Sequence, residues 1–392
     1  MNTFIFFITL IQFIITDKTL KYSYHLNYGK YCINIAIVNE SLSIPYLLPI
    51  DISTNNSIFE LLESTPSEYI GNTIYLTQSY LQYIPVQILS KQISLFEIHN
   101  TTIPLSILNI NNITHAKLVS PRLGFAFKFN DITMSFIHQL KQRSYIDKAS
   151  FTFVGVNRDH NINDMYFGTI PQHIIKDSML HNTCKVNKTR IHDHSGWNCM
   201  IDYVYFDNDV NNIYNANNVV YFTTARSDTI VPMKFVHFVK NNILRNAFDN
   251  KMCYGSKKDE MLIMCVCSYL NNIGKVGFVI EGYLHLFKIE DIFDIYQPGY
   301  SDNDFCELVI VPNIDEDVWI FGTDFLRNYI SEFNYETESV TLYSENIIKI
   351  KNTNTNNNIS DSHMNILFYI KLNIIILSVY CFLLFIFKYT YK

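Results

Sequence analysis

The most informative stretch of this sequence is VWIFGTDFLRNYISEFNYETESVTLY, residues 318–343. An apolar pair runs into a glycine near its start, and it ends in SVTLY (339–343), whose β-branched and aromatic residues favour a strand. The segment PRLGFAF (121–127) repeats the apolar pair before a glycine. In addition, Asp51 and Thr223 each follow a predicted strand and open a polar turn. Such internal echoes indicate a duplicated lobe.

Most of the remaining chain has the pattern of short strands separated by turn residues. The predicted strands are YCINIAIV (31–38), SFTFVGV (150–156), DYVYF (202–206), NVVYF (218–222), KVGFVIEGYLHLF (275–287) and ELVIV (307–311). Two helices are predicted, over 132–146 and over 231–244, the second opened by Pro232 in its first turn. The pattern therefore predicts a mainly β fold.

Both ends of the sequence indicate a membrane-bound protein of the secretory pathway. Residues 1–17 form a short apolar run that is typical of a signal peptide. Residues 366–387 are apolar over the length that a single transmembrane helix requires, and the polar segment 346–363 is expected to be a flexible stalk before it. A signal for a lipid (GPI) anchor, with small residues at 360–362, is the alternative. We expect a luminal or extracellular domain on a single-pass anchor.

Composition excludes one class of partner. The chain has 392 residues, of which 48% are hydrophobic and 17% charged, and a formal net charge of -6. It contains no long run of lysine and arginine and no basic stripe interleaved with aromatic residues, which are the usual footprints of a nucleic-acid-binding protein. Nucleic acid is therefore not expected to be a partner.

The cysteines and glycosylation sequons fit the same compartment. Of eight cysteines, Cys381 lies in the predicted anchor, so seven remain for an oxidising lumen and one of these stays unpaired. A bond between Cys184 and Cys199 would close a hairpin. The sequence predicts a glycoprotein from sequons at Asn39, Asn55, Asn100, Asn112, Asn187 and Asn358.

No metal or cofactor is expected. The segment 181–199 is rich in potential zinc ligands, namely His181, Cys184, His192, His194 and Cys199. These residues form neither a Cys-x-x-Cys pair nor a helix-borne histidine pair, so an oxidised hairpin is favoured over a zinc site. A glycine-rich phosphate loop and a Gly-x-Ser-x-Gly nucleophile turn are also missing from the sequence.

Residues 318–343 resemble the C-terminal signature of pepsin-like aspartic proteases, and residues 120–174 resemble that family's strand, helix and interlobe link. The resemblance covers about residues 28–343. It implies two β-barrel-like lobes around a cleft, an N-terminal lobe (24–170) and a C-terminal lobe (171–345). By the same resemblance, either Cys265 or Cys267 is expected to pair with Cys306 in the C-terminal lobe.

In that family each lobe contributes an Asp-Thr-Gly turn, and the two carboxylates share one proton to activate water. The resemblance places the first turn at Asp51, Ile52, Ser53 and Thr54. Asp51 retains the catalytic carboxylate position. Ile52 replaces the hydroxyl residue that bonds across to the other lobe, and Ser53 replaces the glycine.

The second turn is expected at residues 223–227, by the family's spacing before Pro232. Thr223 replaces the second aspartate, and Thr224 matches the family's hydroxyl residue. Ala225 and Arg226 continue the cleft turn, and the guanidinium of Arg226 is expected to bring a positive charge close to Asp51. Asp228 is interpreted as a cap or charge at the start of the following helix.

The family's flap, a hairpin that closes over substrate, is expected at LQYIPVQILSKQI (81–93), with Tyr83 as the flap tyrosine. The alternative is that Tyr83 lies in an ordinary strand. Pro85 removes one backbone donor from this segment.

These residues predict a protease homologue whose dyad is degenerate. We expect it to be inactive or severely weakened and to bind peptides or a partner protein through its cleft. One alternative is an active aspartic endopeptidase with an unusual site. The other is a surface structural or adhesion protein that uses only the fold.

Overall fold

The structure is a computed structural model. It describes residues 19–27, 30–39, 42–52, 58–59, 68–69, 74–78, 82–95, 102–109, 123–127, 135–155, 162–188, 196–206, 213–255, 262–271, 273–296, 305–313 and 317–350. Outside these ranges lie the signal peptide (1–17), the anchor (366–387), Ser53, Thr54, His192, His194 and the sequons at Asn55, Asn100, Asn112 and Asn358. Within them, no helix is long and apolar enough to cross a membrane.

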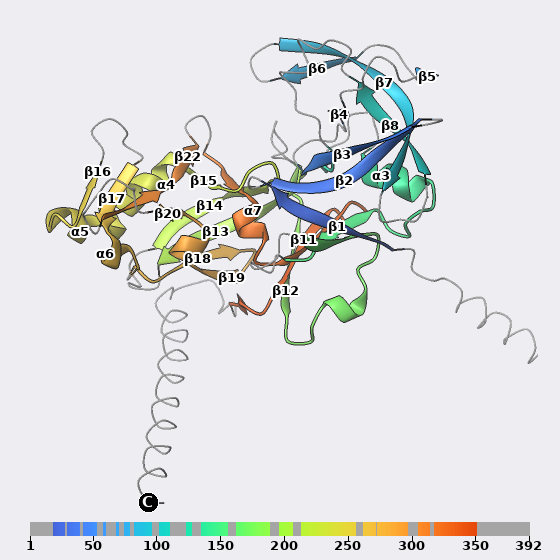
Figure 1. Cartoon of the computed structure of the whole chain (residues 1–392). Coiled ribbons are helices and arrows are strands. Elements are labelled where there is room, and N and C mark those ends of the chain that lie inside the picture. Colours follow the sequence, from blue (N-terminus) through green and yellow to red (C-terminus); the bar gives the residue numbers. More distant parts are fainter. Residues whose placement is uncertain are drawn as a thin grey trace, which may run out of the picture.

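The described chain is mainly β, as predicted, and its strands form three sheets (Figure 1). The strands of the N-terminal half are β1 (Leu20–Asn27), β2 (Lys30–Asn39), β3 (Leu42–Asp51), β4 (Ile58–Phe59), β5 (Glu68–Tyr69), β6 (Ile74–Gln78), β7 (Gln82–Leu95), β8 (Thr102–Asn109), β9 (Leu123–Gly124), β10 (Ser150–Phe153) and β11 (Ile162–Phe167). Those of the C-terminal half are β12 (Leu180–Lys185), β13 (Asn198–Phe206), β14 (Ile213–Phe222), β15 (Thr229–Pro232), β16 (Cys253–Gly255), β17 (Leu262–Val266), β18 (Lys275–Ile280), β19 (Tyr283–Lys288), β20 (Asp294–Tyr296), β21 (Phe305–Val309), β22 (Val311–Asn313), β23 (Trp319–Phe321), β24 (Ile330–Asn334), β25 (Ser339–Ser344) and β26 (Ile347–Lys349).

The first sheet joins the two halves of the chain. Its order is β12-β25-β24-β10-β11-β1-β2-β7-β8-β4, with β3 on β2, β9 on β3, and β5 and β6 on β7. The junction is the antiparallel pairing of β10 with β24, which sets Ser150 opposite Asn334 and Phe153 opposite Ser331. The second sheet runs β22-β15-β23-β14-β13-β18-β19-β26, and the third runs β16-β17-β21-β20. The two expected lobes therefore share a hydrogen-bonded sheet.

Helices are short. They are α3 (Phe136–Gln142), α4 (Met233–Phe238), α5 (Arg245–Asp249), α6 (Cys267–Asn271), α7 (Thr323–Leu326), the 3-10 turns η1 (Gln172–Ile174) and η4 (Ile289–Asp291), and the π-helical turn η3 (Val239–Ile243). α3 begins later than the predicted 132–146 because the Ser135 hydroxyl caps it, accepting from the His138 amide. Pro232 precedes α4 as its N-cap and ends β15, so its predicted place inside the helix was wrong by one residue.

Two strand predictions also require correction. Residues 275–287 form a hairpin rather than one strand, because Glu281 and Gly282 have φ angles of 50° and 76° and turn the chain between β18 and β19. Strand β26 follows residue 345 and pairs with β19, setting Leu284 opposite Ile348. The folded part therefore extends into the first residues of the segment predicted to be a stalk.

An aromatic core crosses the shared sheet. The rings of Phe151 on β10 and Phe333 on β24 stack with centroids 4.9 Å apart and planes 11° apart. Trp197 packs edge-on against Phe333 at 5.3 Å and against Tyr335 at 4.9 Å. Phe125 lies 5.1 Å from Phe151. All five side chains are buried, so one hydrophobic core supports both halves of the molecule.

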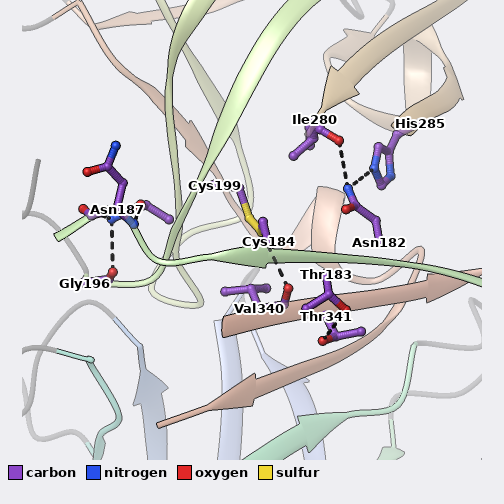
Figure 2. Close-up of a disulfide and its surroundings, with 11 residues drawn as sticks. Asn182, Thr183, Cys184, Asn187, Gly196, Cys199, Ile280, His285, Val340 and Thr341 are labelled. Carbon is purple, nitrogen blue, oxygen red and sulfur yellow. Dashed lines mark hydrogen bonds between the residues drawn. A yellow bond between two sulfur atoms is a disulfide. The ribbon is translucent and has the colours of Figure 1, made fainter. Parts of the chain in front are cut away.

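A buried polar network ties β12 to the second sheet. In Figure 2 the side-chain amide of Asn182 points at both the Ile280 carbonyl and the His285 ring, at 3.0 Å each. The other ring nitrogen of His285 lies 2.9 Å from the Tyr329 hydroxyl. Burial lowers the pKa of His285 to about 3, so its ring is neutral at neutral pH.

Candidate functional site

Asp51 is the last residue of β3 and is 4% exposed. Strand β9 runs parallel to the end of β3, which sets Ile50 opposite Leu123 and Asp51 opposite Gly124. The next amide, that of Phe125, donates to the Asp51 carbonyl at 2.9 Å. The backbone of Asp51 is thus fixed by a strand that begins at Leu123, 72 residues further along the chain.

Thr223 follows β14 and is 6% exposed. Strand β23 runs parallel to the end of β14 and sets Phe222 opposite Phe321, as β9 sets Ile50 opposite Leu123. The Thr223 amide donates to the Phe321 carbonyl at 3.0 Å. Thr223 and Asp51 therefore have equivalent positions in the strand pairing of their two lobes. This equivalence follows from the register and does not depend on sequence spacing.

The two turns meet through one hydroxyl group. Thr224 Oγ1 donates to the Ile50 carbonyl at 2.6 Å and lies 3.3 Å from the Ile52 amide, which donates to it. Thr224, Ile50 and Ile52 are all fully buried. Because Ile52 has no hydroxyl group, its side chain cannot return the same pair of bonds to the other turn. Ile52 therefore differs from Thr224, whose hydroxyl group bonds across to the other turn.

The hydroxyl of Thr223 already has a partner inside its own turn, since the Ala225 amide donates to Thr223 Oγ1 at 3.2 Å. A threonine hydroxyl stays protonated through the physiological pH range and carries no negative charge to share a proton with a neighbouring carboxylate. At the two equivalent positions the site therefore offers one carboxylate, that of Asp51, and one neutral hydroxyl.

Arg226 forms an ion pair with Asp228, and the Ser227 hydroxyl donates to the other Asp228 oxygen at 2.8 Å. Partial burial raises the pKa of Asp228, but the hydrogen bonds from Arg226 and Ser227 outweigh it and hold the pKa below its usual value. Strand β15 separates Asp228 from α4, so the prediction that Asp228 caps this helix was wrong. The charge of Arg226, expected near Asp51, is paired within its own turn.

Gly322 allows the following segment to pack onto this turn. A Cβ atom at Gly322 would lie 2.3 Å from the Ser227 carbonyl oxygen and 2.5 Å from that of Asp228. The next amide, of Thr323, donates to the Arg226 carbonyl at 3.0 Å. A side chain larger than hydrogen at residue 322 would therefore displace the backbone of the second turn.

The first turn has supports that the sequence did not reveal. Trp197 Nε1 and the Tyr335 hydroxyl each donate to the Phe125 carbonyl at 2.7 Å. Both donors belong to the C-terminal lobe, and both are buried. Tyr335 lies inside the informative stretch 318–343. The sequence pattern around it does not predict a hydrogen bond to the other lobe.

Of the expected flap segment 81–93, residues 82–93 lie on strand β7 of a hairpin. Strands β6 and β7 pair antiparallel, with Tyr83 opposite Thr77 and Pro85 opposite Tyr75. Figure 1 shows this hairpin projecting beyond β3 at the top of the molecule. The backbone of Tyr83 therefore lies on a hairpin strand. This position is compatible both with a flap and with an ordinary strand.

Three disulfides are present among the described residues, and they join Cys184 to Cys199, Cys253 to Cys265, and Cys267 to Cys306. Of the two partners considered for Cys306, the structure has Cys267. Cys265 pairs instead with Cys253, which the sequence did not single out. Cys32 is the free cysteine of the described chain and is buried. Figure 2 shows the bond between Cys184 and Cys199 beside β25.

No group of three or more His, Cys, Asp or Glu side chains in the described ranges is arranged to hold a metal ion. In the segment 181–199, Cys184 and Cys199 are joined to each other rather than free to bind a metal.

Comparisons with known proteins identify the relatives of this chain. The family model described as eukaryotic aspartyl protease matches residues 93–344. Among solved structures, the aspartic proteinase from Irpex lacteus superposes with a TM-score of 0.63 at 13% sequence identity, over 86% of this chain and 100% of that chain. No curated protein matches. At this identity the structural likeness establishes the fold alone.

Proposed function

Because the chain belongs to the eukaryotic aspartyl protease family, we propose that it is a member that has lost efficient peptide hydrolysis and uses its cleft to bind peptides or a partner protein. The observation that carries this proposal is the position of Thr223. The residue before it, Phe222, pairs with Phe321 as the residue before Asp51, Ile50, pairs with Leu123, and this likeness of register supports the proposal.

The chemistry explains why this replacement matters. Two carboxylates about 3 Å apart cannot both ionise, so one serves as acid while the other serves as base. Asp51 alone cannot hold both protonation states at once. When catalytic groups act as a unit, removal of one typically costs about four to six orders of magnitude in rate. Hydrolysis through Asp51 alone is therefore expected to be very slow.

Binding makes different demands from hydrolysis. An extended peptide is held mainly by backbone hydrogen bonds to an exposed strand edge and by pockets for alternate side chains. The turns at Asp51 and Thr223 are still joined by Thr224, and a hairpin still stands at 74–95. Neither feature needs a second carboxylate.

We further propose that the protein works in the secretory pathway or at the cell surface on a single-pass anchor, with glycans on its luminal or extracellular side. Three disulfides support an oxidising compartment. The signal peptide and the anchor rest on residues 1–17 and 366–387 of the sequence.

The test is cleavage of a diverse quenched-fluorescence peptide library by the full-length protein in detergent, from about pH 3 to about pH 7. We expect the wild type to cleave no faster than Asp51→Ala, and we expect both to retain peptides from the library in a binding assay. Cleavage that disappears in Asp51→Ala would instead show an active endopeptidase. Loss of both cleavage and peptide or partner binding would refute the cleft proposal.

The acidic end of this assay requires a folding control. The pKa of His285 is lowered on folding, so the histidine contributes stability that is complete above its unfolded pKa, about 6.5, and is lost as the pH falls toward about 3. The loss is about 1.4 kcal/mol of unfolding free energy per pH unit across that range. Near-UV circular dichroism at each pH separates an inactive folded protein from an unfolded one.

A further inference from the structure

A second cluster of reactive groups lies away from the cleft, in the third sheet. Strands β16, β17 and β21 and helix α6 carry four cysteines, joined as Cys253 to Cys265 and Cys267 to Cys306. Figure 1 shows β16, β17 and α6 at the end of the C-terminal lobe that is remote from β1 to β3. Nothing in the proposed binding function uses these residues.

The strand register places one cysteine between two possible partners. Cys265 on β17 lies directly opposite Cys253 on β16 and directly opposite Cys306 on β21. Directly opposed residues of antiparallel strands project from the same face of a sheet. The three sulfur atoms therefore lie on one face, in a row across three strands.

The register also brings Cys265 opposite Cys306, within the range that a disulfide can bridge. Opposed Cα atoms of an antiparallel pair are about 4.5 to 5.5 Å apart, within the span of about 4.4 to 6.8 Å that disulfides usually bridge. The present bonds join Cα atoms 4.0 Å apart for Cys253 and Cys265 and 4.8 Å apart for Cys267 and Cys306. A bond between Cys265 and Cys306 is therefore compatible with the existing pairing of β17 and β21.

The two disulfides differ in access. Cys253 is 3% exposed and Cys265 is completely buried. Cys267 and Cys306 are both partly exposed. A thiol in solution therefore meets the outer bond, between Cys267 and Cys306, before the inner one.

We propose that these four cysteines form a thiol–disulfide exchange site that accepts electrons from a dithiol, either a small molecule or the active site of a dithiol oxidoreductase. A dithiol thiolate attacks Cys267 Sγ, and the electron pair of the broken bond leaves on Cys306. The second dithiol thiolate then attacks the mixed disulfide, which releases the Cys267 thiolate and the oxidised dithiol.

The Cys306 thiolate next attacks Cys265 Sγ, which forms a bond between Cys265 and Cys306 and releases the Cys253 thiolate. The net reaction transfers two electrons. One dithiol becomes a disulfide, and the protein exchanges two disulfides for one disulfide and the thiols of Cys253 and Cys267. The new bond keeps β17 joined to β21, whereas β16, which carries Cys253, loses its disulfide link to β17.

The test is limited reduction of the folded full-length protein in detergent with dithiothreitol at about pH 8, close to the pKa of an ordinary thiol. Acid quenching, alkylation and peptide mapping by mass spectrometry then locate free thiols and linked peptides. We expect alkylated Cys253 and Cys267 together with a peptide pair linked through Cys265 and Cys306. The bond between Cys184 and Cys199 serves as an internal standard.

Three results would overturn the proposal. One is alkylation of Cys267 and Cys306 with the inner bond intact. Another is alkylation of all four cysteines without the pair linked through Cys265 and Cys306. The third is resistance of both bonds under conditions that already reduce the bond between Cys184 and Cys199.

A matched pair of double variants tests the order of the steps. In Cys267→Ser/Cys306→Ser the relay is absent, and we expect the inner bond to be reduced at least about 10-fold more slowly than in the wild type. In Cys253→Ser/Cys265→Ser we expect the outer bond to be reduced at the wild-type rate. Equal rates for the inner bond with and without the relay would contradict the proposed order. Peptide mapping of the wild type decides the question on its own if a variant does not fold.

Discussion

The turn at Asp51 and the turn at Thr223 have the same backbone plan and different chemistry. Each follows a strand that a later strand joins in parallel, with Ile50 opposite Leu123 in one lobe and Phe222 opposite Phe321 in the other. Their side-chain supports differ. Phe125 donates its amide to the Asp51 carbonyl and accepts two side-chain bonds from the other lobe. The second turn contains an ion pair and packs against a glycine of its own lobe.

This difference shows that the scaffold and the catalytic groups have separate requirements. The strand pairings use backbone atoms, so they tolerate replacement of an aspartate by Thr223. Acid–base chemistry uses side chains, so it does not. The proposed loss of hydrolysis is therefore confined to a few side chains at the meeting point of the turns, and it should be reversible there.

The largest expected effect comes from making the two turns alike. Thr223→Asp supplies a second carboxylate, and Ile52→Thr supplies the missing hydroxyl group. We expect the double variant to cleave peptides at least about 100-fold faster than the wild type, as a partial recovery of a dyad that acts as a unit. The measurement is the initial rate on the quenched-peptide library at acidic pH.

The control for this gain is the same double variant carrying Asp51→Ala, which should be inactive. A folded double variant that remains inactive, as judged by near-UV circular dichroism, would show that the lesion extends beyond these two side chains. A gain that survives Asp51→Ala would contradict the role of Asp51 in a dyad.

The next largest effect concerns the bond that joins the turns. Thr224→Val keeps the shape of the side chain but leaves the Ile50 carbonyl and the Ile52 amide buried without this partner. We expect the free energy of unfolding to fall by about 3 kcal/mol, since each unpaired buried group costs about 1 to 3 kcal/mol. Urea unfolding monitored by fluorescence measures the change.

Thr224→Ser retains the hydroxyl group and is the matched control, with an expected loss of about 1 kcal/mol for the buried methyl group. Equal losses in Val and Ser variants would mean that packing, rather than the hydrogen bonds, makes Thr224 important.

The sequence predicted the features that depend on local pattern. Short runs of β-branched and aromatic residues located several strands, among them β2, β10, β13, β14 and β25, and the repeated glycine segments led to a two-lobed fold. The positions of Asp51 and Thr223 followed from a family resemblance, and the strand register places the two residues equivalently.

What the sequence could not predict depends on contacts between distant residues. Asp228 was interpreted from its neighbour in sequence, a helix, whereas its actual partner is the guanidinium of Arg226. Cys253 pairs with Cys265 because two strands align, and no spacing rule specifies that alignment. The single helix predicted over 231–244 is divided into α4 and the π-helical turn η3. The apolar periodicity continues through both, so it could not predict the division.

The third effect tests how closely the second turn is packed. Gly322→Ala places a Cβ atom against the carbonyl oxygens of Ser227 and Asp228, which belong to the backbone and cannot rotate away. We expect a loss of about 2 kcal/mol in unfolding free energy, typical of overpacking. Gly255→Ala in the same lobe is the control, because nothing lies within 4 Å of its Cβ position. A loss equal to that of the control would show that the turn accommodates a side chain.

The smallest effect isolates the ion pair that distinguishes the second turn from the first. Asp228→Asn removes the charge, keeps the shape of the side chain and leaves one acceptor oxygen in place of the two that receive Arg226 and Ser227. Because folding lowers the pKa of Asp228, its carboxylate stabilises the protein above its unfolded pKa of about 3.8, and this contribution disappears as the pH falls through the folded value. We expect a loss of at most about 1 kcal/mol at neutral pH, as for a partly exposed ion pair.

The pH dependence separates this electrostatic contribution from a change in packing. Urea unfolding of the wild type and of Asp228→Asn should give different midpoints at neutral pH, and the midpoints should converge as the pH falls below the unfolded pKa of about 3.8 and through the lower folded pKa of Asp228. A difference that persists unchanged in acid would assign the effect to the shape of the side chain. Arg226 would then be held by the turn rather than by the charge of Asp228, and the two turns would differ in packing alone.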